Sequence, residues 1–99
     1  MNRLRLSVAA KADLLAIHRY ISRDSHAAAD RVVSDLESFL TTLTTMPERH
    51  PLRADVGTGR RLAPRKNYIV IYRFVREESL VRILRGVHSA RDLTSLSQS

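Results

Sequence analysis

The chain has 99 residues, which fits a single domain, 1–99, that buries roughly 60–70% of the surface its unfolded form exposes. It contains no cysteine, which excludes disulfides and thiolate metal sites, and its 43% hydrophobic residues are enough for a modest core. No apolar stretch reaches the length of a signal peptide or a membrane-spanning helix, so we expect a cytoplasmic protein that does not enter membranes.

The positive charge is concentrated in the second half of the chain. Residues 1–48 hold six Lys/Arg and six Asp/Glu, whereas residues 49–99 hold eleven Lys/Arg and four Asp/Glu and so carry the whole net charge of +7. Every basic residue except Lys11 and Lys66 is arginine, whose planar fork binds phosphate or carboxylate bidentately. A genome rich in arginine codons explains the Arg/Lys ratio but not the asymmetry. The pattern therefore indicates an anionic partner, either a nucleic acid or an acidic protein segment.

The first half of the chain predicts a short strand and two helices. Residues 3–7 alternate charged and apolar side chains, as in a strand, and Ser7 is a plausible N-cap for a helix over 8–22. One stripe of that helix is apolar and comprises Ala10, Leu14, Ile17 and Ile21. Asp24 or Ser25 can cap a second amphipathic helix that runs to about Met46, before Pro47, and would be roughly 30 Å long. The short link predicts an antiparallel helical hairpin.

The second half predicts a loop followed by three strands. Residues 47–59 contain two prolines and two glycines without periodicity, which is typical of a surface loop. Strands are expected over 60–64, 68–75 and 80–88, joined by short polar turns. The predicted fold is α+β: an N-terminal strand and an antiparallel helical hairpin packed on a three- to four-stranded, largely antiparallel sheet.

The end of the last strand, His88-Ser89-Ala90-Arg91-Asp92, admits a structural explanation and a functional one. Ser89 and Asp92 fit a capping box for a short C-terminal helix through Leu96. This assignment leaves His88 and Arg91 without a structural role. His88 is either an inert histidine at the edge of the core or part of a site that the arginines also face.

Several segments, read in order, resemble the ParE toxins of the ParE/RelE superfamily, the toxin half of bacterial type II toxin–antitoxin pairs. They are "LSVAAKADLLAIHRYIS", "AAADRVV", "GRRLAPRKNYIVIYR" and "ILRGVHSARDL", where Gly86 and Ser89 depart from the family pattern. The resemblance covers about residues 3 to 93. It implies a toxin that inhibits DNA gyrase by binding it, without being an enzyme, and a cognate ParD-like antitoxin that neutralises it in a toxin–antitoxin hetero-oligomer.

The resemblance also raises an alternative, because RelE-like toxins of the same superfamily cleave mRNA in the ribosome. Those toxins usually have an arginine just after the tyrosine of a G-Y or N-Y turn and a tyrosine near the C-terminus. In this chain Ile69 follows Asn67-Tyr68, and no tyrosine occurs after Tyr72. A metal-free ribonuclease site could be drawn from His88 with Arg85, Arg91 and Tyr68. However, Tyr68 and Tyr72 share one strand face with Val70 and Phe74, which predicts core positions.

The candidate residues for target binding or toxicity are basic. They are Arg60, Arg61, Arg85, His88 and Arg91, and together with Arg65 and Lys66 we expect them to form one basic surface. We expect no catalytic residue, no cofactor and no metal, since the four histidines lack ligand spacing. We expect the antitoxin to lay an acidic, partly helical segment along the helical hairpin and the sheet edge. A nucleic-acid-binding module without toxic action is a third hypothesis, and direct nucleic-acid binding is left open.

Overall fold

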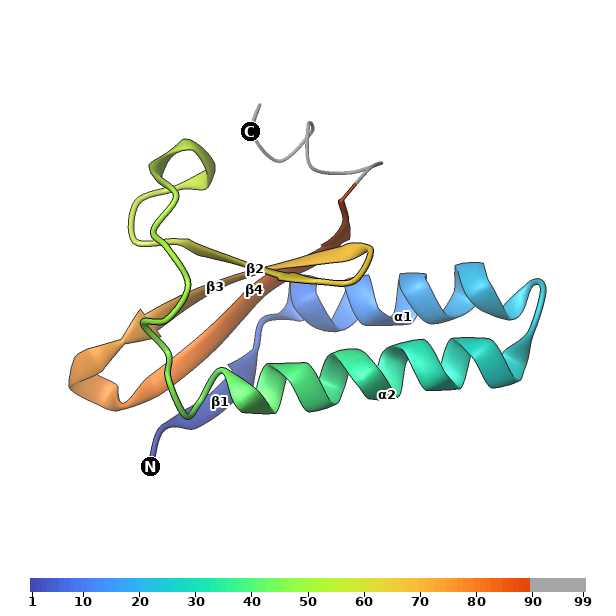
Figure 1. The fold of residues 1–99 in the computed structure, drawn as a ribbon, viewed down its shortest axis with the longest axis horizontal. Coiled ribbons are helices and arrows are strands. Elements are labelled where there is room, and N and C mark those ends of the chain that lie inside the picture. The colour runs from blue at the N-terminus through green and yellow to red at the C-terminus, as the bar shows by residue number, and fades with distance from the viewer. Residues whose placement is uncertain (90–99) are drawn as a thin grey trace.

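The computed structural model describes residues 1–89 and consists of two helices packed on a four-stranded sheet (Figure 1). In chain order the elements are β1 (Arg3–Leu6), α1 (Val8–Ser22), α2 (His26–Thr42), β2 (Arg61–Arg65), β3 (Tyr68–Val75) and β4 (Leu80–His88). Two short 3-10 helices, η1 (Ala54–Val56) and η2 (Arg76–Glu78), lie in the connections before β2 and β4. The α+β class, the helical hairpin and the order of elements predicted from the sequence are confirmed.

The sheet is mixed, with the strand order β1-β4-β3-β2. The strands β2, β3 and β4 form an antiparallel meander, while β1 lies parallel to β4 at the opposite edge from β2. A bulge between Ile71 and Tyr72 shifts the register of β3 with β4. The first and last strands of the chain are therefore neighbours, so every residue of β1 contacts a strand about 77 positions away.

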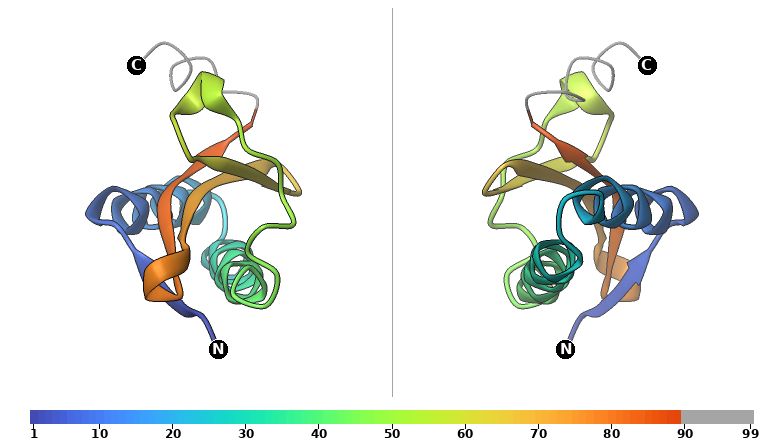
Figure 2. Two further views of the ribbon diagram at one scale, coloured as in Figure 1. Left: turned by 90° about the vertical axis from the view of Figure 1, so that its left-hand side faces the viewer. Right: turned by 90° about the vertical axis from the view of Figure 1, so that its right-hand side faces the viewer.

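Both helices cover the same face of the sheet (Figure 2). Each begins at a serine whose hydroxyl accepts a hydrogen bond from the amide three residues later, Ser7 from Ala10 and Ser25 from Ala28. The apolar stripes predicted from the sequence face the sheet. Together with the strands they form the main core, which consists of Ala10, Leu40, Leu43, Ala63, Val70, Tyr72, Val81 and Ile83.

Residues 47–59, predicted as a surface loop, also contribute to the core, and with Arg60 they form the 47–60 segment. Val56 is only 6% exposed and packs with Leu62 and Ile71 on the sheet face that the helices leave uncovered. The amide of Arg53 donates to the carbonyl of Arg60 at 2.7 Å, which closes the loop. Figure 2 shows the η1 part of this segment on the other side of the sheet from the helical hairpin. The sequence pattern did not predict this, because the buried residues of the segment, Pro47 and Val56, are isolated and form no periodic pattern.

Two predicted boundaries differ from the structure. The second helix ends at Thr42 instead of near Met46, because the amides of Leu43, Thr44 and Thr45 bond carbonyls three residues back and tighten the chain into turns. Strand β2 continues through Pro64 to Arg65. A proline is tolerated there because β2 is an edge strand, where one row of amide groups needs no partner. Among residues 1–89, no helix is long and apolar enough to cross a membrane.

Candidate functional site

Arg85, a candidate target-binding residue, joins α1 to β4. Its guanidinium donates to both carboxylate oxygens of Asp13 at 2.7 and 3.0 Å, and the amide of Gly86 donates to the same carboxylate at 3.0 Å. The side chain of Asp13 is only 16% exposed, whereas that of Arg85 is 39% exposed. Arg85 therefore has a structural role and still presents part of its side chain to solvent.

Arg65 makes the equivalent link between β2 and α2. It donates to Asp35 from Nε at 2.9 Å and from Nη2, and its guanidinium lies 5.7 Å from the centre of the Phe39 ring. The hydrogen bonds from Arg65 hold the pKa of the Asp35 carboxyl below its usual value. Lys66 adds a more distant contact, with Nζ 3.6 Å from the Asp35 carboxylate. The two arginine–aspartate pairs fasten one helix each to the sheet.

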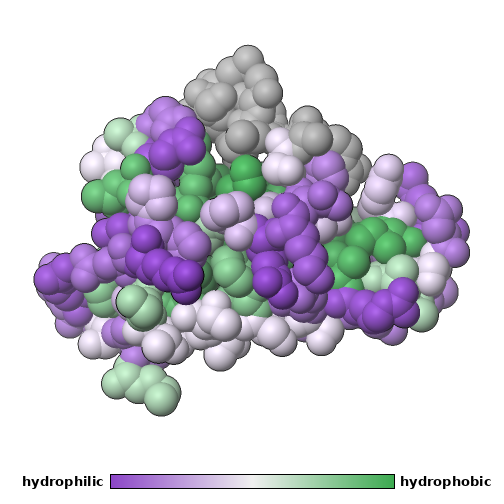
Figure 3. Space-filling view, viewed as in Figure 1, coloured by the Kyte–Doolittle hydropathy of each residue, from purple (hydrophilic) through white to green (hydrophobic). Residues whose placement is uncertain are grey.

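A groove with a basic rim runs between α2 and the edge strand β2. Arg65 separates it into two clefts, which both include its side chain. The first cleft lies at the C-terminal end of α2 and is lined by Phe39, Thr42, Leu43, Thr45, Met46, Arg49, His50, Pro64 and Arg65. The second is lined by Ala28, Arg31, Val32, Asp35, Leu36, Arg65, Lys66, Asn67 and Tyr68. Figure 3 shows strongly hydrophilic side chains next to apolar ones in the region above α2.

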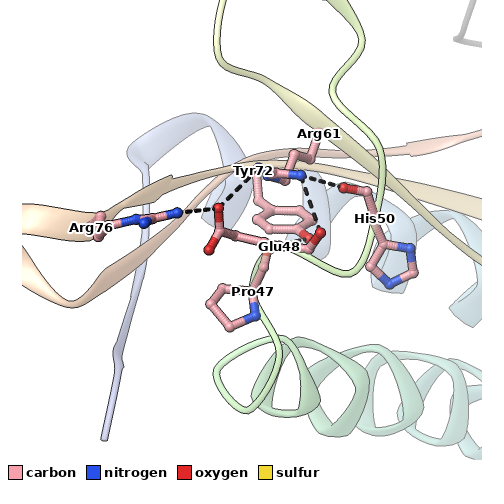
Figure 4. Close-up of polar contacts among 6 residues, drawn as sticks. All are labelled: Pro47, Glu48, His50, Arg61, Tyr72 and Arg76. Atoms are coloured by element: carbon pink, nitrogen blue, oxygen red, sulfur yellow. Dashed lines mark hydrogen bonds and ion pairs between the residues drawn. The ribbon is translucent and has the colours of Figure 1, made fainter.

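Arg61 fastens the segment that follows α2 to the sheet (Figure 4). Its Nη1 donates to the carbonyl of His50 at 2.7 Å and to that of Glu48 at 3.3 Å, and Nη2 lies 3.7 Å from the Glu48 carboxylate. Glu48 also forms an ion pair with Arg76. The hydroxyl of Tyr72, a fully buried residue, donates to the carbonyl of Pro47 at 2.8 Å, and burial raises the pKa of this phenol. Arg61 of β2, Tyr72 of β3 and Arg76 of η2 therefore hold the start of the 47–60 segment.

Arg60 and His88 lie in other surroundings. Arg60 Nη1 donates to the carbonyl of Val56 at 3.0 Å, and its side chain passes so close to Gly57 that a Cβ there would lie 2.5 Å from Arg60 Cδ. Gly57 has φ of +137°, so glycine is favoured on two grounds.

His88 pairs across the strands with Tyr68, and their rings meet edge to face with centroids 5.5 Å apart. Arg91 lies outside the described residues, as does the predicted C-terminal helix.

Within residues 1–89, no group of three or more His, Cys, Asp or Glu side chains is placed to hold a metal ion. Burial lowers the pKa of His50, and the charge of Arg49 lowers it further, so this histidine is neutral near pH 7. It packs edge to face against both Phe39 and Tyr72. We therefore assign His50 a packing role.

The comparison with family models decides the family. The model described as "ParE toxin of type II toxin-antitoxin system, parDE" matches residues 4–93, which is nearly the whole chain. The chain belongs to the ParE toxin family. A search of curated proteins found no match.

Solved structures similar to this ParE-family toxin come from both branches of the superfamily. The toxin–antitoxin complex RelBE2 from Mycobacterium tuberculosis shares 28% identity with a TM-score of 0.67, covering 88% of this chain and 96% of that chain. A chromosomal ParDE system from P. aeruginosa has 24% identity and a TM-score of 0.73, covering 89% and 96%. The intact E. coli RelBE complex has 14% identity and a TM-score of 0.64, covering 89% and 96%. Together with the family match, the likeness to the RelBE2 toxin places the chain in the ParE/RelE superfamily of type II toxins.

The basic side chains predicted as sites of this ParE-family toxin contact four different segments of the chain. Arg61 and Arg85 lie on strands that flank β3, opposite Tyr72 and Ile71. Their guanidinium groups nevertheless bind different segments, His50 and Glu48 for Arg61 and Asp13 for Arg85. Arg60 contacts the η1 loop, and Arg65 with Lys66 contacts α2. The sequence did not reveal these pairings, because the aspartates involved are 30 and 72 positions from their arginines.

Proposed function

We propose that this toxin inhibits DNA gyrase by binding it, and that a cognate ParD-like antitoxin with an acidic segment neutralises it. The observation that carries the proposal is the match of the ParE model over residues 4–93. The position after the N-Y turn supports it. Ile69, where RelE-like toxins usually have an arginine, packs against the cluster of Val56, Leu62 and Ile71. An isoleucine side chain carries no charge, so Ile69 cannot serve as the catalytic cation that an arginine would provide at this position.

The test is induced expression without the antitoxin. We expect growth arrest with DNA damage signalling and filamentation, and loss of supercoiling when purified toxin is added to purified gyrase. Mapping of mRNA 5′ ends after induction provides the control. New cuts phased with ribosomes and appearing before any DNA break would contradict the gyrase assignment.

A RelE-like ribosome-dependent endonuclease is the second candidate, and one contact favours it. Tyr68 and His88 lie opposite each other on β3 and β4, with Arg85 on the same strand as the histidine. An imidazole with nearby arginines can act as a general base beside a phosphate. Replacing His88 by Phe keeps an aromatic ring against Tyr68 but removes the base. Under the gyrase proposal, His88→Phe reduces toxicity less than His88→Ala, whereas a ribonuclease loses activity in both.

For the antitoxin, we propose that its acidic segment occupies the groove between α2 and β2. The groove combines apolar lining from Phe39, Leu43 and Val32 with basic side chains on its rim. A segment that folds on binding needs both, since apolar contacts provide most of the affinity and charges provide orientation. Hydrogen exchange of the purified complex tests this placement. Protection confined to residues 47–59 would contradict it.

A further inference from the structure

Three arginines form a row across adjacent strands on the sheet face opposite the helices. Arg5 of β1 is in register with Arg82 of β4, and Arg82 is in register with Arg73 of β3. All three residues are exposed. Because strands lie about 4.8 Å apart, the row spans about 10 Å. None of these residues was singled out by the sequence analysis.

Strand alternation determines the face on which the row lies. Leu4 and Leu6, the neighbours of Arg5, pack against the main core beneath the helices. Tyr72 and Phe74 flank Arg73 and contact the same core, as do Val81 and Ile83 beside Arg82. Because successive side chains of a strand point to opposite faces, the row lies on the face that carries η1 and the end of the 47–60 segment. Gly59 of that segment lies against Arg73, where a Cβ would be 3.3 Å from Nη2.

The row carries three like charges without compensation. Like charges directly opposite each other in a sheet are destabilising. Within residues 1–89, neither Arg5, Arg73 nor Arg82 forms an ion pair with a carboxylate. Glu77 and Glu78, in the turn between β3 and β4, form none with the row, and Glu48 is bound to Arg61 and Arg76. Arg85 and Arg65, in contrast, each have an aspartate. An unbalanced row indicates a ligand that supplies the negative charge.

We propose that the Arg5–Arg82–Arg73 row binds the phosphodiester backbone of a nucleic acid. Guanidinium groups bind phosphate bidentately, and such contacts position a protein on a nucleic acid without reading its sequence. The aromatic side chains of β3 contribute to the opposite face, so this surface offers no platform for base stacking. The proposal is independent of the antitoxin placement, because it concerns a different face from the groove. It is independent of the gyrase assignment, because it concerns a different class of ligand.

An acidic peptide fits this surface less well. A peptide that orders on binding needs exposed apolar anchors beside the charges. The exposed large hydrophobic residues of the described chain are Met1, Val8, Leu15, Tyr20, Met46 and Leu52, and none belongs to β1, β3 or β4. A phosphodiester chain needs only cations at a regular spacing.

The test compares two triple variants of the purified full-length chain that remove the same charge. Arg5→Gln/Arg73→Gln/Arg82→Gln removes the row, and Lys11→Gln/Arg19→Gln/Arg23→Gln removes three exposed cations of the helical hairpin. Binding to a short labelled duplex DNA and to a single-stranded RNA of equal length is measured by fluorescence anisotropy over a series of salt concentrations. We expect the row variant to lose about tenfold or more in affinity, with the slope of log K against log salt reduced by about 2–3. The control variant should keep the wild-type slope.

The outcomes are distinct. Tighter binding of the DNA duplex or of the RNA shows which kind of nucleic acid supplies the phosphodiester backbone, and either result supports the proposal. Equal losses in the two variants would overturn it, because binding would then depend on net charge alone. Tighter binding of poly-glutamate than of either nucleic acid, lost in the row variant, would assign the row to an acidic protein instead. The row variant should also melt about 2–5 °C above the wild type, since repulsion is relieved, and a lower melting temperature would count against an uncompensated row.

Discussion

At the residue scale, the structure changes how Arg85 must be tested. Its guanidinium is bound to Asp13, whose side chain is largely buried, so removing the arginine also leaves a carboxylate with only the Gly86 amide. A loss of toxicity in an alanine variant would therefore mix two effects. Arg61 presents the same problem, because it holds the carbonyls of Glu48 and His50.

Asp13→Asn provides the control that separates these effects, since it weakens the link but keeps the arginine. We expect Arg85→Ala and Asp13→Asn each to lower the free energy of unfolding by about 1–3 kcal/mol, because each removes charge-assisted hydrogen bonds. We expect Arg85→Ala to reduce toxicity further than Asp13→Asn at matched stability. Thermal melts and growth assays of both variants measure this. Equal toxicity would show that Arg85 acts only through the fold.

The ionisation of Asp35 makes the stability of the folded protein depend on pH. Its pKa is lowered in the folded protein by the hydrogen bonds from Arg65, so its contribution to stability is fully present above the unfolded value of about 3.9. The contribution is lost as pH falls through the lower, folded pKa. We expect the melting temperature of the wild type to fall more steeply below about pH 4 than that of Asp35→Asn. Parallel curves for the two proteins over this range would contradict the assignment.

At the element scale, each helix is held by a cap and one arginine–aspartate pair. The Ser7 hydroxyl makes one more hydrogen bond than that of Ser25, because it accepts from the Ala10 amide and also donates to the carbonyl of Leu84 at 2.9 Å. The Ser25 hydroxyl accepts only from the Ala28 amide among the described contacts. The start of α1 is therefore joined to β4 twice, through Ser7 and through Asp13.

The two serines form a matched pair of variants. We expect Ser25→Ala to lower the free energy of unfolding by about 1 kcal/mol, the usual cost of a lost N-cap. Ser7→Ala should lower it by about 1 kcal/mol more, because the Leu84 carbonyl also loses its donor. Urea denaturation of both variants measures the difference. Equal values would mean that the bond from Ser7 to β4 does not contribute.

The groove between α2 and β2 yields a prediction for the antitoxin. Arg31 and Arg49 are exposed residues on the rims of its two clefts, while Arg23 lies in the turn between the helices. We expect Arg31→Glu and Arg49→Glu each to weaken antitoxin binding about tenfold, because an acidic segment would face a like charge. Arg23→Glu should change affinity less than about twofold, as a distant surface charge. Titration calorimetry with the antitoxin measures all three, and equal effects would place the segment elsewhere.

At the scale of the whole molecule, positive charge is arranged on two faces. One face carries the groove beside α2, and the other carries the Arg5–Arg82–Arg73 row. An antitoxin in the groove would leave the row accessible. We therefore expect the toxin–antitoxin complex to retain binding of nucleic acid by the toxin, measured with an antitoxin fragment reduced to its acidic segment. Loss of that binding on complex formation would show that the two faces share one ligand.

The sequence by itself determined the α+β class, the helical hairpin, the Ser7 cap and the three-stranded meander, and it left Asp24 or Ser25 as the cap of the second helix, where the structure has Ser25. These features depend on periodicity, caps and turns, which act over a few residues and can be read locally. It also identified arginine as the dominant cation. The family resemblance came from the order of short motifs, which the family match over residues 4–93 confirms.

Only the tertiary structure decided what each arginine does. Whether an arginine meets an aspartate, a carbonyl or another arginine depends on strand order and register, which link positions 30 to 77 residues apart. The parallel pairing of β1 with β4 brings Arg5 beside Arg82, and the antiparallel register of β3 with β4 adds Arg73. The packing of α1 on β4 places Arg85 beside Asp13, while 39% of the Arg85 side chain stays exposed. Local patterns carry no information on such pairings, because they arise when the distant strands pack together.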